Sequence, residues 1–198
     1  MDKPANTDLP IHPLIRGRYS PRAFADKAVA AGDVTLLLEA ARWAASCFND
    51  QPWRFLVATR ERPEGHAKML GCLVESNQRW ASAAPVLLLC VAARNFERSG
   101  KANAHARHDL GLAMGNLSLQ AGALGLSLHI MAGIDREAAR AAYGIPEDFD
   151  VVTGVAVGFA GAPDSLPAEL AERERAPRSR KPLEELVFAD AWGEPRRA

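Results

Sequence analysis

The chain has 198 residues, of which 48% are hydrophobic and 24% charged, and its 24 lysines and arginines balance its 24 aspartates and glutamates. This length suits one domain, and a zero net charge argues against nucleic acid or an anionic membrane as a partner held by bulk electrostatics. Three cysteines without a C-x-x-C pair, a polar N-terminus and no apolar run of about 20 residues argue against a disulfide framework, a zinc site, a signal peptide and a membrane span, and favour the cytoplasm.

The first predicted element is a short helix or turn over residues 9–15, which leads into a basic turn. Arg16, Arg18 and Arg22 lie within seven positions of one another, with Ser20 among them. Guanidinium groups bind phosphate through two parallel hydrogen bonds, and a serine hydroxyl adds a further donor. The turn is therefore a candidate phosphate site, and a solvated basic turn is the alternative.

An amphipathic helix is predicted after Asp33, a suitable N-cap, with apolar residues at helical spacing from Val34 to Ala45. It delivers a loop over residues 46–53 that collects Ser, Cys, Asn, Gln and Trp around a rigid proline. Plain turn residues would be enough to join a helix to a strand. This mixture instead suits a loop that holds a flat polar ligand, and a well-capped loop with Trp53 in the core is the alternative.

Strands and helices mix along the chain to residue 159. The short apolar run over residues 85–91 is typical of a strand buried on both faces. Asp135 suits the start of a helix over residues 136–143, and Gly144 suits its end. The other expected elements are strands at 55–59, 127–131 and 151–159, and helices at 64–82 and 105–126. The mixture places the fold in the α/β or α+β class.

After Gly161 the composition changes to a charged segment that is punctuated by prolines. It carries a second guanidinium–hydroxyl cluster, Arg178-Ser179-Arg180. Such a segment has little core of its own, so we expect it to lie across another surface. Two clusters that met on one phosphate would tie this segment to the basic turn. The sequence motifs of a dinucleotide fold, a phosphate loop and an H-E-x-x-H zinc site do not occur.

Five segments in chain order resemble the FMN-dependent nitroreductase family, and together they cover about residues 12–188. The segments are Arg18-x-Ser20-x-Arg22-x-Phe24; residues 39–46 followed by Asn49-x-Gln51-Pro52-Trp53-x-Phe55; Asn77-Gln78-x-Trp80 before residues 84–86; residues 123–126 followed by Gly133-x-Asp135; and Arg178-x-Arg180 followed by residues 181–185. The chain departs from the family pattern at Ala45, where proline is usual, at Cys47, where serine is frequent, and at Ala132, where some members carry glutamate.

The resemblance implies an α+β fold of the nitroreductase type, with a central mixed, mainly antiparallel β-sheet flanked by helices. It also implies an intertwined homodimer with FMN at the subunit interface. The chain would form a single domain over residues 1–198, with residues 162–198 as an extended C-terminal arm. The expected partners are a second copy of the chain and a small-molecule electron acceptor, with no nucleic acid or membrane.

The resemblance further implies where FMN is held. The two basic clusters would bind the phosphate, Asn77 would bond the pyrimidine edge of the ring, and the backbone at Ala132 and Gly133 would approach N5. The segment of Ser46 and Cys47 would touch the flavin of the partner subunit. The full set of expected cofactor-binding residues is Arg18, Tyr19, Ser20, Arg22, Ser46, Cys47, Asn49, Gln51, Asn77, Met131, Ala132, Gly133, Arg178 and Arg180.

The implied function is an FMN-dependent oxidoreductase that passes electrons from NADH or NADPH to a nitroaromatic, quinone or enone-type acceptor. No side chain is expected to be catalytic, because the flavin carries the chemistry. A non-catalytic flavin-binding or storage protein is the alternative, as is a family member with specialised flavin chemistry.

Three further residues allow a functional and a structural interpretation. His105 and His108 stand three positions apart beside Asp109, which resembles part of a metal site, but no third ligand is evident and a solvated helix start is favoured. Cys47 lacks an identifiable basic partner, so a contact residue is favoured over a nucleophile. His129 is expected to be packed or hydrogen-bonded near the flavin and not to act as an acid.

Overall fold

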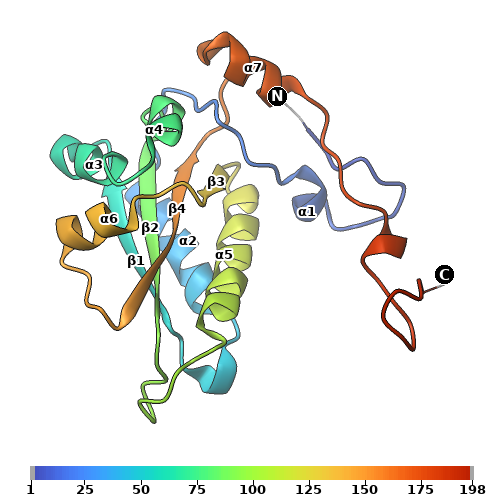
Figure 1. Cartoon of the computed structure of the whole chain (residues 1–198). Helices are drawn as coiled ribbons and strands as arrows, with labels where there is room; N and C mark the ends of the chain where they lie inside the picture. Colours follow the sequence, from blue (N-terminus) through green and yellow to red (C-terminus); the bar gives the residue numbers. More distant parts are fainter. Residues whose placement is uncertain (1–2, 197–198) are drawn as a thin grey trace.

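A four-stranded sheet with helices on both faces forms the body of the molecule, as a computed structural model that describes residues 3–196 shows (Figure 1). The strand order is β1-β2-β4-β3, and every neighbouring pair is antiparallel. The strands are β1 (Trp53–Thr59), β2 (Val86–Ala93), β3 (Ser127–Met131) and β4 (Phe149–Gly158).

The resemblance implied a mixed sheet, and this prediction is wrong because all three neighbouring pairs are antiparallel. The long helix α5 (Ala106–Ala123) connects β2 to β3. Since both of these strands run antiparallel to β4, they are parallel to each other. The last strand, β4, inserts between them, so the parallel relation never becomes a hydrogen-bonded pair.

The two faces of the sheet are covered by different helices, and β2 contributes to both cores. Val86, Leu88 and Cys90 face the core that includes α5 and α2 (Ala31–Arg42). The alternate residues Leu87 and Leu89 face the core of α3 (Pro63–Leu70), α4 (Glu75–Ala81) and α6 (Arg136–Tyr143). This alternation confirms a strand that is buried on both faces.

Two expectations about helices need correction. The single helix over residues 64–82 is two helices, α3 and α4, because the chain between them pairs with the segment after β3. Leu73 forms a β-bridge with Ile134, and the amide of Asp135 donates to the carbonyl of Cys72 at 2.8 Å. Asp33 is not an N-cap, because α2 begins two residues earlier and places Asp33 in its first turn.

The helix α6 confirms the sequence prediction at both ends. The Asp135 side chain accepts a hydrogen bond from the amide of Ala138 at 2.9 Å, and so caps the start of the helix. Gly144 ends it in a left-handed conformation with φ of 60°, which a glycine adopts without steric cost. Since α6 follows β3 closely, its N-cap Asp135 lies just after the turn that contains Ala132 and Gly133.

Both ends of the chain leave the body together. The short helix α1 (Pro13–Gly17) and the N-terminal segment lie beside the arm that follows α7 (Ala168–Arg175), as Figure 1 shows. Short 3-10 turns lie at η1 (Cys47–Asn49), η2 (Pro163–Ser165) and η3 (Leu183–Glu185). In the part of the chain that the structure describes, no helix is both long enough and apolar enough to cross a membrane.

Candidate functional site

The two basic clusters predicted from the sequence meet beside α1. Arg178 donates from Nη1 to the carbonyl of Arg16 at 3.1 Å. Partial burial lowers the pKa of Arg18, and the positive charges of Arg178 and Arg180 lower it further. Across residues 3–196, none of these three guanidinium groups forms an ion pair with a carboxylate. Three unpaired cations at one place favour binding of an anion.

The basic turn carries a hydroxyl and is fixed to β3. Arg18 donates from Nη1 to Oγ of Ser20 at 3.2 Å, and Nδ1 of His129 lies 2.9 Å from the carbonyl oxygen of Pro21. Since a carbonyl oxygen only accepts, Nδ1 of His129 carries the proton. The imidazole also packs on the ring of Trp80, with 4.6 Å between ring centres. The turn is therefore anchored on the sheet and on α4.

His129 supplies a test by pH. Burial lowers its pKa to about 4 from an ordinary value of 6.5, and the charges of Arg22 and Arg18 act in the same direction. As the pH falls from about 6.5 towards 4, the unfolded chain takes up this proton before the folded one, so stability falls. We expect the wild type to lose on the order of 1 kcal/mol per pH unit in this window.

The measurement for His129 is thermal unfolding of the wild type and of His129→Gln between pH 4 and 8. Glutamine still donates to the Pro21 carbonyl but does not titrate. The melting-temperature difference between the two proteins should be constant above about pH 6.5 and should shift in favour of the variant below it. Parallel curves over the whole range would contradict a neutral, buried His129.

The residues expected at the ring of the cofactor also lie together. Nδ2 of Asn77 donates to the carbonyl of Gly133 at 3.0 Å, and Oγ1 of Thr153 donates to the carbonyl of Met131 at 2.6 Å. Ala132, between them, is exposed, whereas Met131 is buried. His129 lies within β3, whereas Gly133 lies in the turn after the end of that strand. The site therefore has a basic end and a separate amide-lined end.

Gly133 is packed too tightly to accept a side chain. A Cβ atom there would lie 2.6 Å from Nδ2 of Asn77 and 2.7 Å from Cγ2 of Val74. We expect Gly133→Ala to displace Asn77 and to lower the free energy of unfolding by about 1–3 kcal/mol. The measurement is urea unfolding, with Gly65→Ala as the control. Gly65 lies inside α3 with open space around it, so alanine should stabilise there by up to about 1 kcal/mol.

The loop between α2 and β1 is the third group of predicted residues, and it is held in an unusual backbone conformation. Phe48, Asn49 and Gln51 have φ of 55°, 57° and 49°, a region that is costly for residues other than glycine. Oγ of Ser46 accepts from the amide of Gln51 at 3.0 Å. The surrounding hydrogen bonds therefore determine a shape that the local sequence does not favour.

Asp109 corrects the expectation of a solvated helix start, which was favoured over part of a metal site for the stretch that contains His105, His108 and Asp109. Its side chain is buried, and Oδ2 accepts from the amide of Cys47 at 2.9 Å. Oδ1 lies 3.1 Å from Nδ1 of His108. Among the described residues, no three His, Cys, Asp or Glu side chains come together as a metal site. Asp109 instead fixes the loop onto the first turn of α5, a contact for which the sequence contains no local signal.

Within one chain, this loop lies far from the basic clusters. Cys47 contacts α5 at Asp109, while Leu14 of α1 lies against the same helix at Gly122. Thirteen residues of α-helix separate these contacts, or about 20 Å. Figure 1 likewise shows α1 at the end of α5 opposite to the cyan loop that precedes β1. The structure thus brings the residues predicted for the phosphate and for the ring near β3, and it does not bring the loop to them.

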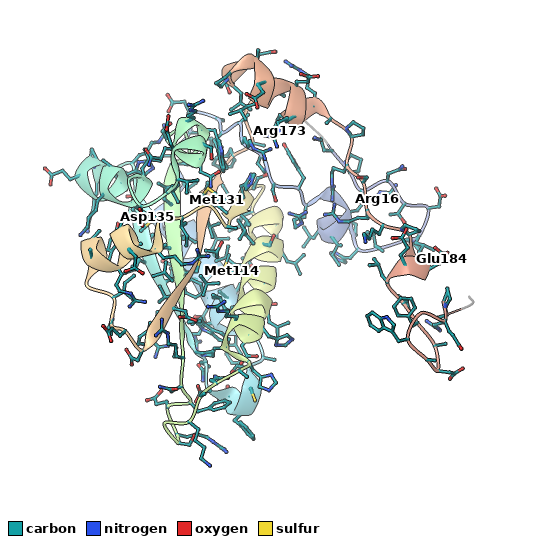
Figure 2. All side chains as sticks on the ribbon, viewed as in Figure 1. Arg16, Met114, Met131, Asp135, Arg173 and Glu184 are labelled. Carbon is teal, nitrogen blue, oxygen red and sulfur yellow. The ribbon has the colours of Figure 1, made fainter. Side chains whose placement is uncertain are left out.

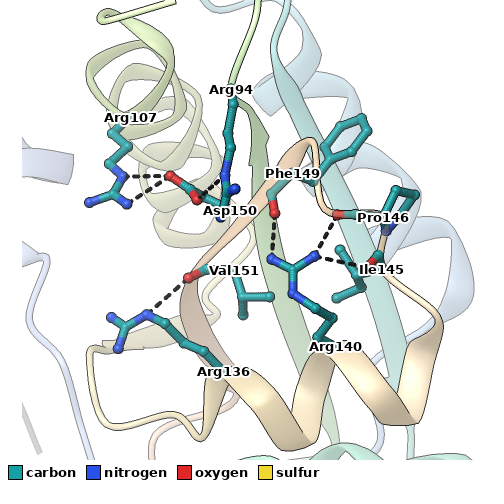
Figure 3. A network of polar contacts seen from close by, with 9 residues as sticks. All are labelled: Arg94, Arg107, Arg136, Arg140, Ile145, Pro146, Phe149, Asp150 and Val151. Atoms are coloured by element: carbon teal, nitrogen blue, oxygen red, sulfur yellow. Dashed lines mark hydrogen bonds and ion pairs between the residues drawn. The ribbon is translucent and has the colours of Figure 1, made fainter.

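A cleft of about 700 Å³ runs along the side of α5 from Arg18 to Arg107. Its walls are mostly apolar and include the exposed side chains of Leu112 and Ile130. At the far end, Arg107 and Arg94 both bind the carboxylate of Asp150, each at 2.7 Å (Figure 3). Burial raises the pKa of Asp150, but the hydrogen bonds from both arginines outweigh it and hold that pKa below its ordinary value.

The remaining arginines in Figure 3 cap backbone carbonyls at the start of β4. Arg140 donates to the carbonyls of Ile145 at 2.8 Å and Phe149 at 2.7 Å, and Nε of Arg136 donates to that of Val151 at 3.1 Å. These bonds satisfy backbone groups outside the sheet ladder. This network therefore stabilises the entry into β4 and is distinct from the basic clusters beside α1.

Comparison with known proteins identifies the family of this chain. Residues 15–159 match the sequence model of the nitroreductase family. A Mycolicibacterium smegmatis protein, described as an uncharacterized 15.4 kDa protein in the ask 5' region, is 32% identical over 149 residues, which span 72% of this chain and 99% of that protein. The chain belongs to the nitroreductase family.

Solved structures show the same similarity. An oxidoreductase containing FMN is 35% identical, superposes with a TM-score of 0.90, and the match covers 96% of each chain. A Desulfovibrio desulfuricans protein, described as a nitroreductase in complex with FMN, is 28% identical with a TM-score of 0.67, over 94% of this chain and 99% of that one.

Proposed function

We propose that this chain is an FMN-dependent oxidoreductase. The observation that carries the proposal is the convergence of Arg18, Arg178 and Arg180 beside Ser20, without carboxylate partners among the described residues. A phosphate dianion suits such a donor set, because guanidinium and hydroxyl groups donate and carry positive charge. The similar oxidoreductase at 35% identity contains FMN.

The predicted residues beside α1 and around the end of β3 could hold the phosphate and the ring of FMN separately. Arg18, Ser20, Arg22, Arg178 and Arg180 would hold the phosphate, with Tyr19 in the same turn. Asn77 on α4, together with Met131, Ala132 and Gly133 at the end of β3 and in the turn after it, would line the ring. The bound flavin supplies the redox chemistry that passes electrons from NADH or NADPH to a nitroaromatic, quinone or enone-type acceptor, while the protein binds and orients it.

We further propose that the flavin site is shared between two copies of the chain. Ser46, Cys47, Asn49 and Gln51 lie about 20 Å from the basic clusters along α5, so they reach a flavin only from a partner subunit. The exposed apolar side chains of Leu112 and Ile130 beside the cleft suit burial against a second copy. A homodimer would place the strained loop of one chain over the flavin of the other.

The test is the absorbance spectrum of the purified protein, followed by anaerobic mixing with NADH and, separately, NADPH. We expect a yellow protein whose band near about 450 nm bleaches rapidly with at least one of the two reductants. A flavoprotein that binds FMN but bleaches with neither would be a carrier or storage protein. A colourless protein that neither binds added FMN nor gains thermal stability from it would contradict the proposal.

A further inference from the structure

One acidic side chain reaches into the basic turn from the C-terminal arm. Glu174 lies on α7 and is only 4% exposed. Its Oε2 accepts a hydrogen bond from the backbone amide of Arg22 at 3.1 Å. Among the described residues, this carboxylate forms no ion pair with a guanidinium group. Here it binds a neutral amide, so the nearby guanidinium groups are left available to an anion.

The N-terminal segment links the same two parts of the chain. The ammonium group of Lys3 donates to the backbone carbonyls of Glu174 and Ala176. Arg178 in turn donates to the carbonyls of Lys3 and Arg16. Arg16, labelled in Figure 2, marks where α1 lies against the arm. The positions of Arg178 and Arg180 therefore depend on the hydrogen bonds that attach α7 to the basic turn.

Attachment of the C-terminal arm to the basic turn has an electrostatic cost. Arg18, Arg178 and Arg180 repel one another, and burial of Arg18 strengthens that repulsion. The bond from Glu174 to the Arg22 amide opposes separation of the arm from the turn, and an anion bound between the cations would oppose it as well. Two interactions that stabilise the same arrangement strengthen each other, and this coupling is reciprocal.

We propose that Glu174 is a positioning residue that couples attachment of the C-terminal arm to binding of the phosphate. It holds the amide of Arg22 and so keeps the arginines of the arm facing those of the turn. The inference rests on the proposed function, since it takes the phosphate to be that of FMN. FMN would then stabilise attachment of the arm to the turn through its phosphate, whereas riboflavin, which lacks that group, would not.

The first experiment uses the wild type alone. Hydrogen–deuterium exchange is measured on peptides that cover residues 19–25 and α7, without ligand, with saturating FMN and with saturating riboflavin. We expect FMN to slow exchange in both segments at least about threefold more than riboflavin does. Equal protection by the two flavins, with both bound, would overturn the coupling and leave the proposed function intact. If FMN did not bind at all, the proposed function would fail first.

The second experiment compares variants of Glu174. Glu174→Ala removes the bond that holds the arm to the turn, so FMN binding should weaken about tenfold. Riboflavin has no phosphate for the arginines of the arm to contact, so its binding should change by less than about twofold. Glu174→Gln retains an acceptor oxygen and should restore most of the FMN affinity. Glu172→Ala, an exposed change on the same helix, is the matched control.

Other results would contradict the proposal. If alanine and glutamine both tightened FMN binding, Glu174 would act as a charge that competes with the phosphate. If alanine weakened FMN and riboflavin equally, its role would be to support the fold. Leu166 and Leu170 pack α7 onto the body independently of Glu174, so we expect every variant to fold. The wild-type exchange experiment tests the coupling without any variant.

Discussion

Replacing Arg18 with alanine is expected to weaken FMN binding by about 1.5–3 kcal/mol, the scale of a charge-assisted hydrogen bond. Arg180→Ala should have an effect of the same size. Arg18 is positioned by its bond to Ser20 and lies close enough to Arg178 and Arg180 for their charges to act on it. Each substitution removes one donor and one positive charge from the place where the phosphate would bind. The measurement is fluorescence titration of the apoprotein with FMN.

Riboflavin lacks the phosphate of FMN, so it tests whether the arginines act through that group. It should lose much less affinity than FMN in both variants, since the arginines have no phosphate to contact. Arg173→Ala is the control, because Arg173 is an exposed arginine of α7 that lies outside the two basic clusters. Equal losses of FMN and riboflavin affinity would mean that the arginines act elsewhere in the protein.

The elements that the sequence predicted well are those with local chemical signals. The helix α6 has an aspartate cap at one end and a left-handed glycine at the other, and both were visible as residue types. The strand β2 is an uninterrupted apolar run, and the structure buries it on both faces. The break between α3 and α4 had no such signal, because it arises from a β-bridge between Leu73 and the distant Ile134.

The residues of the candidate site likewise fall into a group that was predicted from local chemistry and a group that was not. The arginines and Ser20 were predicted from their side-chain chemistry, and the structure brings the two basic clusters together. Asp109 and Glu174 were not predicted, because each acts on a backbone amide that is far away in the sequence. A carboxylate that binds a distant amide looks, in the sequence, like any charged residue of a helix. Such positioning residues become visible only when the fold is known.

The largest effect on FMN binding is expected from dissociation of the proposed homodimer. Each flavin site would need the basic clusters of one chain and the 46–51 loop of another, which lie about 20 Å apart along α5 within one chain. We therefore expect an obligate homodimer whose interface exceeds the roughly 2,000 Å² that is typical of permanent assemblies. Dilution to monomer should release FMN. The measurement is analytical ultracentrifugation, detected at the absorbance of the flavin and of the protein.

Deletion of the chain after Gly161 should abolish flavin binding, because it removes Glu174, Arg178 and Arg180 together. It should also abolish the dimer, because the arm has little core of its own and would embrace the partner. Deletion after Phe188 is the matched control. It keeps all three residues and removes a segment in which the side chain of Trp192 is 92% exposed, so FMN binding should persist. A monomer that sediments with bound FMN would refute the shared site and leave the flavin assignment standing. A dimer that persists in the longer deletion would instead place the contact surface on α5 and the sheet, away from the arm.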